Sequence, residues 1–308
     1  MYITTLMKQT LFKKLSVAAT LLVTLASCSG DETILLPPDN SNIGQITTEL
    51  PFAKQGRPYT PACPLLPSQY AGNVTARWSD STGELLNEDR QTDGISYKTF
   101  RWDKAGTQEV TCQMNYNYAD EEKELRQTKT IEVLPPLLLD CHFLDNIEEV
   151  KEKHPLLTQV VKSATGSTIE TYTDNSDTKE HTFFFTNSRL TRIQGKETTG
   201  KKDFYQELLS LIENAYDGQA DDLEFRGTIL GEPVLTHEET DILKKITNKE
   251  TLTPEEKEIV NRLIENERLY LTVSLTKEFS TVSSKMTFGF VRQNSGYILS
   301  RQYICELK

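Results

Sequence analysis

Alternating polar and apolar residues dominate the chain between about residues 45 and 135. The runs Asn73 to Trp78 and Gln108 to Tyr118 alternate with a period of two, and Ser96 to Trp102 is a third candidate strand. A period of two places every second side chain on the same face, so these runs predict strands buried on one side. Turn residues such as Asp, Ser, Thr and Gly separate them. We therefore expect an all-β domain over 45–135.

A different pattern begins after Pro135-Pro136. Asp203 to Tyr216 repeats apolar residues every three or four positions, which predicts a helix. Thr236 can form a capping box with Glu239, and Thr253 precedes a proline and two acids, so each predicts a helix start. The β-type segments 269–275, 282–292 and 297–305 end the chain. This order predicts an α+β domain over 137–308, with helices packed on one face of an antiparallel sheet.

Two segments of the second half resemble each other. Thr182-Phe183-Phe184-Phe185 and Thr287-Phe288-Gly289-Phe290 share a Thr-Phe-x-Phe pattern, and an Asn-Ser pair follows each. A duplicated unit of helix and hairpin would explain the similarity, and so would the ordinary composition of strands. The sequence leaves both explanations open.

The N-terminus carries a leader. Three lysines precede the apolar run Leu15 to Leu25, which is too short to span a bilayer and fits a secretory signal peptide. Ala26 and Ser27 directly before Cys28 resemble the lipobox of bacterial lipoproteins. The resemblance implies that residues 1–27 are removed and that Cys28 receives acyl chains, which tether the protein to a membrane. The alternative is an ordinary secreted protein with a chance cysteine.

The residues after Cys28 bear on the location of the protein. Asp31 and Glu32 resemble the surface-export signal of lipoproteins in the Bacteroides group, which implies a place on the cell surface, anchored in the outer membrane. The alternative is the periplasmic face of that membrane. Residues 28–44 include Pro37-Pro38 and a polar stretch, and are expected to form a flexible tether.

The predicted β domain contains a tryptophan between two cysteines. Trp78 lies between Cys63 and Cys112, and Ala105-Gly106-Thr107 leads into the strand that carries Cys112. This arrangement resembles PKD-like and immunoglobulin-like domains, although the Gly-Asp-Gly turn typical of PKD domains is missing. The resemblance implies a β-sandwich that acts as a spacer or binding scaffold, with Trp78 in its core.

The cysteines are an even set once Cys28 is set aside. Cys63, Cys112, Cys141 and Cys305 remain, and an even number in an exported chain is typical of disulfides. Of the three possible pairings we favour Cys63–Cys112 and Cys141–Cys305, because each pair then lies inside one predicted domain. Four buried thiols are the alternative.

Charge and motifs limit the chemistry. The net charge is −11, and removal of the leader with its three lysines makes it −14, which argues against nucleic acid as a partner. The sequence carries no zinc, EF-hand or phosphate-loop signature, so we expect no metal and no cofactor. Cys141 beside His142 could form a nucleophile pair, but a structural cysteine is favoured. Adjacent acids such as Asp221-Asp222 are expected by chance among 45 acidic residues.

These observations favour a non-enzymatic, membrane-anchored lipoprotein that binds a glycan or protein ligand or serves as a structural component of the cell envelope. No catalytic residue is predicted. The alternative is a surface hydrolase that acts on glycans through acidic residues of the C-terminal domain, which needs two carboxylates facing each other across a cleft.

Overall fold

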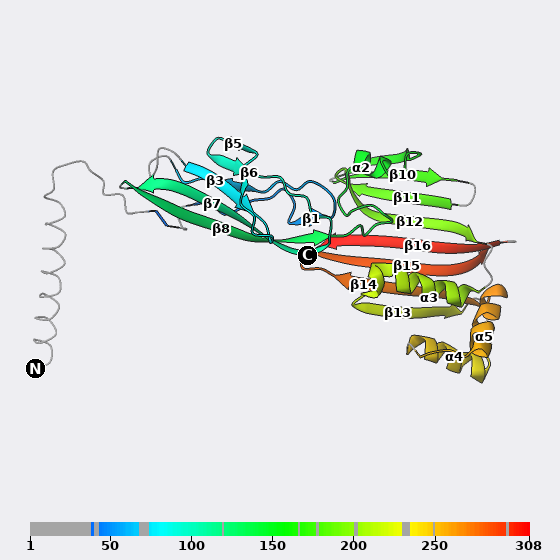
Figure 1. Cartoon of the computed structure of the whole chain (residues 1–308). Helices are drawn as coiled ribbons and strands as arrows, with labels where there is room; N and C mark the ends of the chain where they lie inside the picture. The colour runs from blue at the N-terminus through cyan, green and yellow to red at the C-terminus, as the bar shows by residue number, and fades with distance from the viewer. Residues whose placement is uncertain are drawn as a thin grey trace, which may run out of the picture.

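The computed structural model describes residues 38–39, 43–67, 74–118, 120–165, 167–176, 179–199, 203–229, 235–248, 250–293 and 296–308 (Figure 1). The leader, Cys28 and most of the predicted tether lie outside these residues. Strands make up 50% of the chain and helices 18%, in several sheets, so the expectation of a mostly β protein is confirmed. No helix among the described residues is long and apolar enough to cross a membrane.

The first half of the chain forms two sheets. Its strands are β1 (Phe52–Lys54), β2 (Ala62–Pro64), β3 (Val74–Ser79), β4 (Leu86–Asn87), β5 (Arg90–Thr92), β6 (Ile95–Tyr97), β7 (Gly106–Tyr118) and β8 (Glu121–Leu134). One sheet has the order β1-β8-β7-β3-β4 and the other β2-β6-β5. The third candidate strand is shorter than expected, because β6 ends at Tyr97 and only an isolated bridge between Phe100 and Tyr59 follows it.

The two sheets share one apolar core. Trp78 is fully buried in it, and its indole N–H donates to Ser96 Oγ at 2.9 Å. Cys112 lies opposite Trp78 on the neighbouring strand, and Cys63 belongs to the other sheet. The indole therefore satisfies its one polar group inside the core, as a buried tryptophan requires.

The second half forms one large antiparallel sheet. Its strands are β9 (Thr158–Thr165), β10 (Ser167–Asn175), β11 (Lys179–Thr186), β12 (Arg189–Thr199), β13 (Asp222–Ile229), β14 (Leu269–Glu278), β15 (Val282–Gln293) and β16 (Gly296–Leu307). Their order is β13-β14-β15-β16-β12-β11-β10-β9. Strands β9 and β13 are edge strands that the sequence pattern did not predict.

The helices form where the sequence places caps. They are α2 (Ile147–Lys151), α3 (Phe204–Asn214), the 3₁₀ turn η2 (Ala215–Gly218), α4 (His237–Thr247) and α5 (Pro254–Glu265). Asn146, Thr236 and Thr253 complete capping boxes, and Asp203 caps α3. Helices α3, α4 and α5 pack on β13, β14 and β15, as Figure 1 shows.

The large sheet consists of two similar halves. Strands β9 to β12 and β13 to β16 are consecutive four-stranded runs, which meet through antiparallel pairing of β12 with β16. The two Thr-Phe-x-Phe segments occupy the third strand of each run. In both, the two flanking phenylalanines are buried: Phe183 and Phe185 in β11, Phe288 and Phe290 in β15. This arrangement favours the duplicated unit over chance composition.

The two halves of the chain are tied together at β1 and β8. Alternate residues of β1 point into different cores, since Phe52 stacks on Phe143 in the second core and Ala53 belongs to the first. Glu132 of β8 accepts hydrogen bonds from the backbone N–H groups of Ser280 and Thr281, at 2.8 and 3.0 Å. The junction is therefore both apolar and hydrogen-bonded.

The disulfide prediction differs from the structure. Cys63, Cys112, Cys141 and Cys305 are all buried free thiols. A hydrogen bond to Cys63, together with burial, raises the pKa of Cys112, so these two thiols are in contact. Cys305 instead contacts Ser284 Oγ at 3.5 Å. Cys141 and Cys305 belong to the same core but are not bonded, because Cys141 pairs with Leu138 at a turn outside the sheet, whereas Cys305 lies on β16.

Candidate functional site

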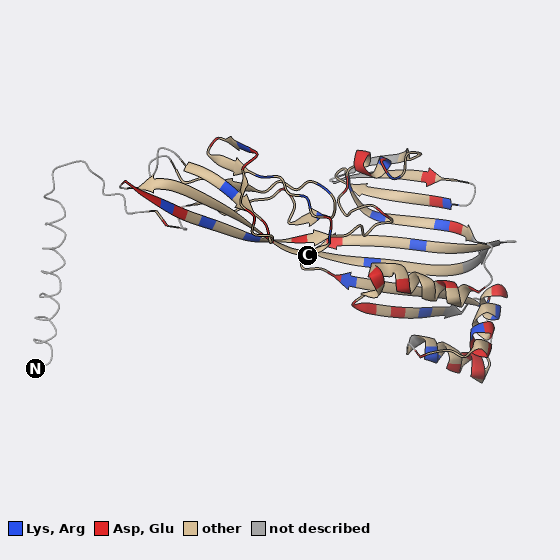
Figure 2. Ribbon diagram, in the orientation of Figure 1, with Lys and Arg blue, Asp and Glu red and all other residues tan. Residues whose placement is uncertain are grey.

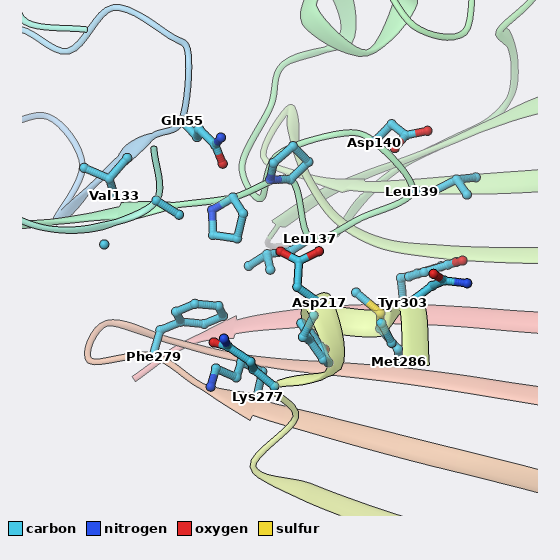
Figure 3. A pocket seen from close by; sticks show the side chains of 18 of the residues that line it. Gln55, Val133, Leu137, Leu139, Asp140, Asp217, Lys277, Phe279, Met286 and Tyr303 are labelled. Atoms are coloured by element: carbon cyan, nitrogen blue, oxygen red, sulfur yellow. The ribbon is translucent and has the colours of Figure 1, made fainter. Parts of the chain in front are cut away.

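A trough lies where the two halves of the chain meet, with a volume of 890 Å³. Figure 3 shows its lining, which comes from five parts of the chain. These are the start of β7 and the end of β8, the linker Pro135-Pro136, the segment at Leu139, the end of α3 with η2, and strands β14 to β16. Gln55, which follows β1, also lines it. Cavities of this size at domain junctions are common ligand sites.

The floor of the trough is the helix-bearing face of the large sheet. Met286 pairs with Tyr303, and Phe288 pairs with Arg301, so these four side chains form two adjacent rows. Burial raises the pKa of Tyr303, so it is an uncharged phenol at neutral pH. An apolar floor with one phenol and one guanidinium suits a ligand with both apolar and polar groups.

One wall of the trough is a two-residue turn built on strained residues. Leu138 and Cys141 exchange backbone hydrogen bonds of 3.0 and 3.1 Å, and Leu139 and Asp140 form the turn between them. Both turn residues are left-handed, with φ of 49° and 62°. Such turns favour Asn-Gly, and an L-residue with a bulky side chain costs roughly 1–2 kcal/mol there.

A second left-handed pair lies on the other side, where α3 ends. Tyr216 and Asp217 both have φ of 52°, and Gly218 follows with φ of 72°. The Tyr216 hydroxyl bonds to Ser284 Oγ at 2.8 Å, which anchors this wall to the sheet. Four of the ten left-handed non-glycine residues among the described ones therefore line the trough. Strained backbone is often found at functional sites.

Two carboxylates of the trough are available to a ligand. Asp140 and Asp217 are exposed, and neither makes a hydrogen bond or ion pair with any residue that the structure describes. Two of the three cations that line the trough are engaged, since Lys277 Nζ lies 3.1 Å from Asp221 and Arg301 Nη2 lies 2.8 Å from Glu197. The two acids can therefore bind N–H or O–H donors.

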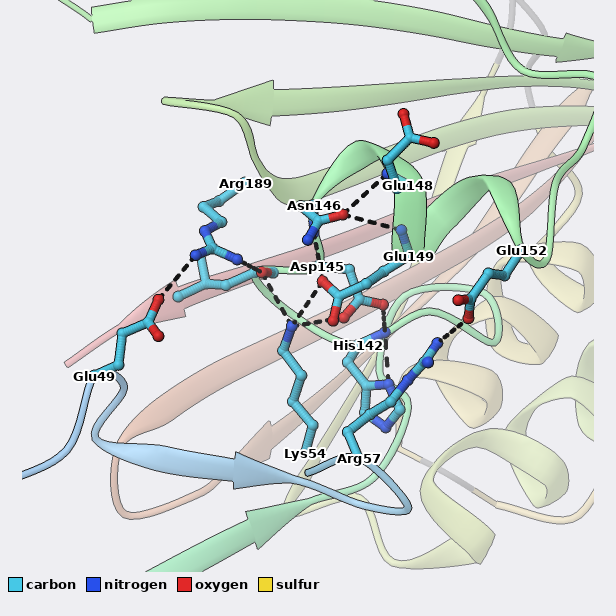
Figure 4. Close-up of polar contacts among 11 residues, drawn as sticks. Glu49, Lys54, Arg57, His142, Asp145, Asn146, Glu148, Glu149, Glu152 and Arg189 are labelled. Atoms are coloured by element: carbon cyan, nitrogen blue, oxygen red, sulfur yellow. Dashed lines mark hydrogen bonds and ion pairs between the residues drawn. The ribbon is translucent and has the colours of Figure 1, made fainter. Parts of the chain in front are cut away.

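An ion cluster holds the junction beside the trough (Figure 4). Lys54 of β1 is 8% exposed, and its ammonium lies 2.7 Å from Asp145 Oδ1, whose side chain is 2% exposed. The same ammonium donates to Leu144 O at 3.1 Å and lies 3.4 Å from Glu149. Arg57 pairs with Glu152 at 2.7 Å nearer the surface. The cluster fixes β1 against α2 and the segment that leads to it.

Two groups of the ion cluster have shifted pKa values. Burial lowers the pKa of His142 despite the neighbouring Asp145, so the imidazole is neutral at pH 7. Burial alone would raise the pKa of Glu149, but the Asn146 N–H and the Lys54 ammonium outweigh it, and the pKa is lowered. Both shifts favour the unprotonated form in the folded state.

None of the site residues predicted from the sequence lines the trough. Cys28 lies outside the described residues, and Trp78, Cys63, Cys112, Cys141 and Cys305 are buried in the two cores. Burial raises the pKa of Cys141 to about 12, so the imagined Cys141–His142 nucleophile has no thiolate at neutral pH.

Two acids named in the sequence analysis, Asp221 and Glu239, have structural partners. Asp221 accepts from the Glu278 N–H and pairs with Lys277, while Glu239 caps α4 and pairs with Arg268. The trough carboxylates Asp140 and Asp217 were missed, because nothing in the sequence brings residues 77 positions apart together. Both turns were also missed because Leu139 and Tyr216, which precede the two aspartates, are not typical turn residues.

The comparisons with known proteins add no family. No protein-family model matches the sequence, and a search of curated proteins found no match. Among solved structures, a conserved protein of unknown function with a hot dog fold from Alicyclobacillus acidocaldarius is 10% identical. The alignment covers 77% of this chain and 79% of that one, with a TM-score of 0.11. That likeness carries no argument about fold or function.

Proposed function

We propose that this chain is a non-enzymatic lipoprotein, anchored in the outer membrane through Cys28, that binds a ligand of the cell envelope in the trough. The trough with its two strained walls is the observation that carries this proposal. Cys28, the acidic residues after it and the tether support display on the cell surface, with the periplasmic face as the alternative.

The proposed architecture has two domains. Residues 45–135 form a PKD-like or immunoglobulin-like β-sandwich, supported by the buried Trp78 and by Cys63 facing Cys112 from the other sheet. Residues 137–308 form an α+β domain, supported by helices that pack on a single antiparallel sheet. The sandwich serves as a spacer and supplies one end of the trough.

A protein segment is the ligand that the trough suits best. Its floor offers apolar side chains, including Met286 and Phe288, which accept apolar side chains of a partner. Its rim offers the carboxylates of Asp140 and Asp217, which accept peptide N–H groups. A glycan is the other ligand class consistent with this lining.

Charge reversal at the rim tests the proposal. The mature protein is immobilised and exposed to a detergent extract of the envelope, and captured material is compared with that of the double variant Asp140→Lys/Asp217→Lys. Loss of one discrete component supports the trough. The matched control is Glu84→Lys/Glu109→Lys, which reverses two exposed acids of the first half.

Two results would contradict the proposal. Capture that is identical in both double variants would remove the trough as the binding site. Turnover of an envelope polymer by the purified protein, abolished by Asp140→Asn or Asp217→Asn, would instead favour the surface hydrolase.

The anchor is tested separately. Intact mass spectrometry of the membrane fraction should give a chain that begins at Cys28 and carries acyl chains. Cys28→Ser should stay unprocessed and unacylated. An unmodified wild-type chain recovered in the soluble fraction would overturn the lipoprotein assignment.

A further inference from the structure

The large sheet has a second face, opposite the helices and the trough. Helices α3 and α5 pack on the face of the sheet that carries Phe288 and Phe290. Residues that alternate with these phenylalanines along β15, such as Thr287, therefore lie on the other face. On that face lies a depression of 390 Å³, which crosses five neighbouring strands from β14 to β11. Figure 2 shows few charged residues along the central strands of the sheet.

An uncharged polar row crosses this face. Register pairing places Thr182 beside Gln194, Gln194 beside Gln302, Gln302 beside Thr287, and Thr287 beside Ser274. All five side chains are partly exposed. A solvated antiparallel sheet face is commonly polar, and the row itself offers only hydroxyl and amide groups. The charged residues that line the depression are Glu180, Lys196 and Arg301.

The two amides of the row are unengaged. Gln194 and Gln302 are direct neighbours, and neither side chain bonds to any residue within the described ranges. Each amide presents donors and an acceptor. Paired amides in a depression can bind adjacent hydroxyl groups of a ligand.

Aromatic rings lie on this face in both halves of the sheet. The Tyr270 hydroxyl bonds to Ser300 Oγ at 3.0 Å and passes over Gly289, where an added Cβ would lie 2.9 Å from that hydroxyl. In the other half, Phe184 holds the guanidinium of Arg192 at 3.9 Å from its ring centroid. Phe184 is the x position of its Thr-Phe-x-Phe segment, whereas the x position of the other segment is Gly289, over which Tyr270 of β14 lies.

We propose that this face binds an uncharged polysaccharide. Its chain lies across the strands along the row from Thr182 to Ser274. The amides of Gln194 and Gln302 bind its hydroxyl groups, and Tyr270 packs against a sugar ring. Each cation of the depression has an acid beside it, since Lys196 faces Glu180 in register and Arg301 pairs with Glu197. A polyanion, whose binding relies on cations, is therefore disfavoured. This site is independent of the trough, which lies on the opposite face of the sheet.

Native gels that contain single polysaccharides test this site. The lipidated full mature chain, solubilised in detergent, is run through gels with glucans, mannans, xylans or galactans, and with polygalacturonate as the charged probe. At least one neutral polymer should retard it. Gln194→Ala/Gln302→Ala should weaken the affinity by roughly tenfold, since two hydrogen bonds are lost. Tyr270→Ala should also weaken it, by at least roughly threefold.

The control is Gln91→Ala, which removes an exposed amide of β5 far from both sites in the sequence and should leave retardation unchanged. Circular dichroism confirms that each variant is folded. Three results would overturn the site. No neutral polymer retards the wild-type chain, only polygalacturonate retards it, or a neutral polymer retards Gln194→Ala/Gln302→Ala as strongly as it retards the wild-type chain. If the trough variants lose capture of the envelope component but are still retarded by the neutral polymer, the site on the second face stands. The two proposals can therefore fail separately.

Discussion

Removal of the Lys54 ammonium should destabilise the protein far more than removal of an exposed ion pair. Lys54→Met keeps the length of the side chain but leaves Asp145 buried at 2% exposure without its cation. Breaking a buried pair costs about 3–5 kcal/mol. The His142 N–H still donates to Asp145 at 2.8 Å, so we expect the lower end of this range, about 3 kcal/mol.

Urea unfolding of the mature chain, followed by circular dichroism, measures this loss. A change of about 3 kcal/mol shifts the midpoint by about 1 M or more. Arg57→Met is the matched control, since Arg57 and Glu152 are 27% and 58% exposed and such pairs contribute about 0–1 kcal/mol. Lys54→Met/Asp145→Asn removes both charges and should recover part of the loss.

The outcome decides whether the junction depends on the buried pair. If Lys54→Met costs no more than Arg57→Met, the ion cluster does not hold β1 against α2. If the double variant is less stable than Lys54→Met, the uncompensated charge of Asp145 is not the cause of the loss.

Three further predictions concern acid, thiols and packing. Because the pKa values of His142 and Glu149 are lowered in the folded state, urea midpoints should fall as pH drops below about 6.5 and again below about 4.5; an acid-independent midpoint would contradict this. The buried thiols, including Cys141, should resist iodoacetamide at pH 8 until urea unfolds the chain; rapid native labelling would refute their burial. Gly195→Ala should cost about 1–3 kcal/mol by collision with the His181 ring, and His181→Ala should relieve it; additive losses would disprove the contact.

Local signals predicted the helices well. The cap residues Asp203, Thr236 and Thr253 each begin a helix at the expected position, because capping depends on neighbours three residues away. The strands with period-two alternation also formed. Edge strands β9 and β13 escaped prediction, because an edge strand buries little and its alternation is weak.

Long-range features could not be read from the chain. The trough depends on the segment at Asp140 and the turn at Asp217 lining the same cavity, and on the turn at Leu139 adopting a conformation that leucine disfavours. Strand β1 contributes Phe52 to one core and Ala53 to the other, and this arrangement depends on tertiary packing. The polar row on the second face depends on strand register, which only the pairing of β12 with β16 establishes.

Photo-crosslinking in intact cells tests the trough most directly. A benzophenone side chain replaces Leu139 in the trough or, as the control, Leu85, which is 47% exposed on the first half. The trough position should crosslink to one discrete envelope component, and Asp217→Lys should abolish that product. The same products from both positions, or none from position 139, would contradict a ligand site between the two halves of the chain.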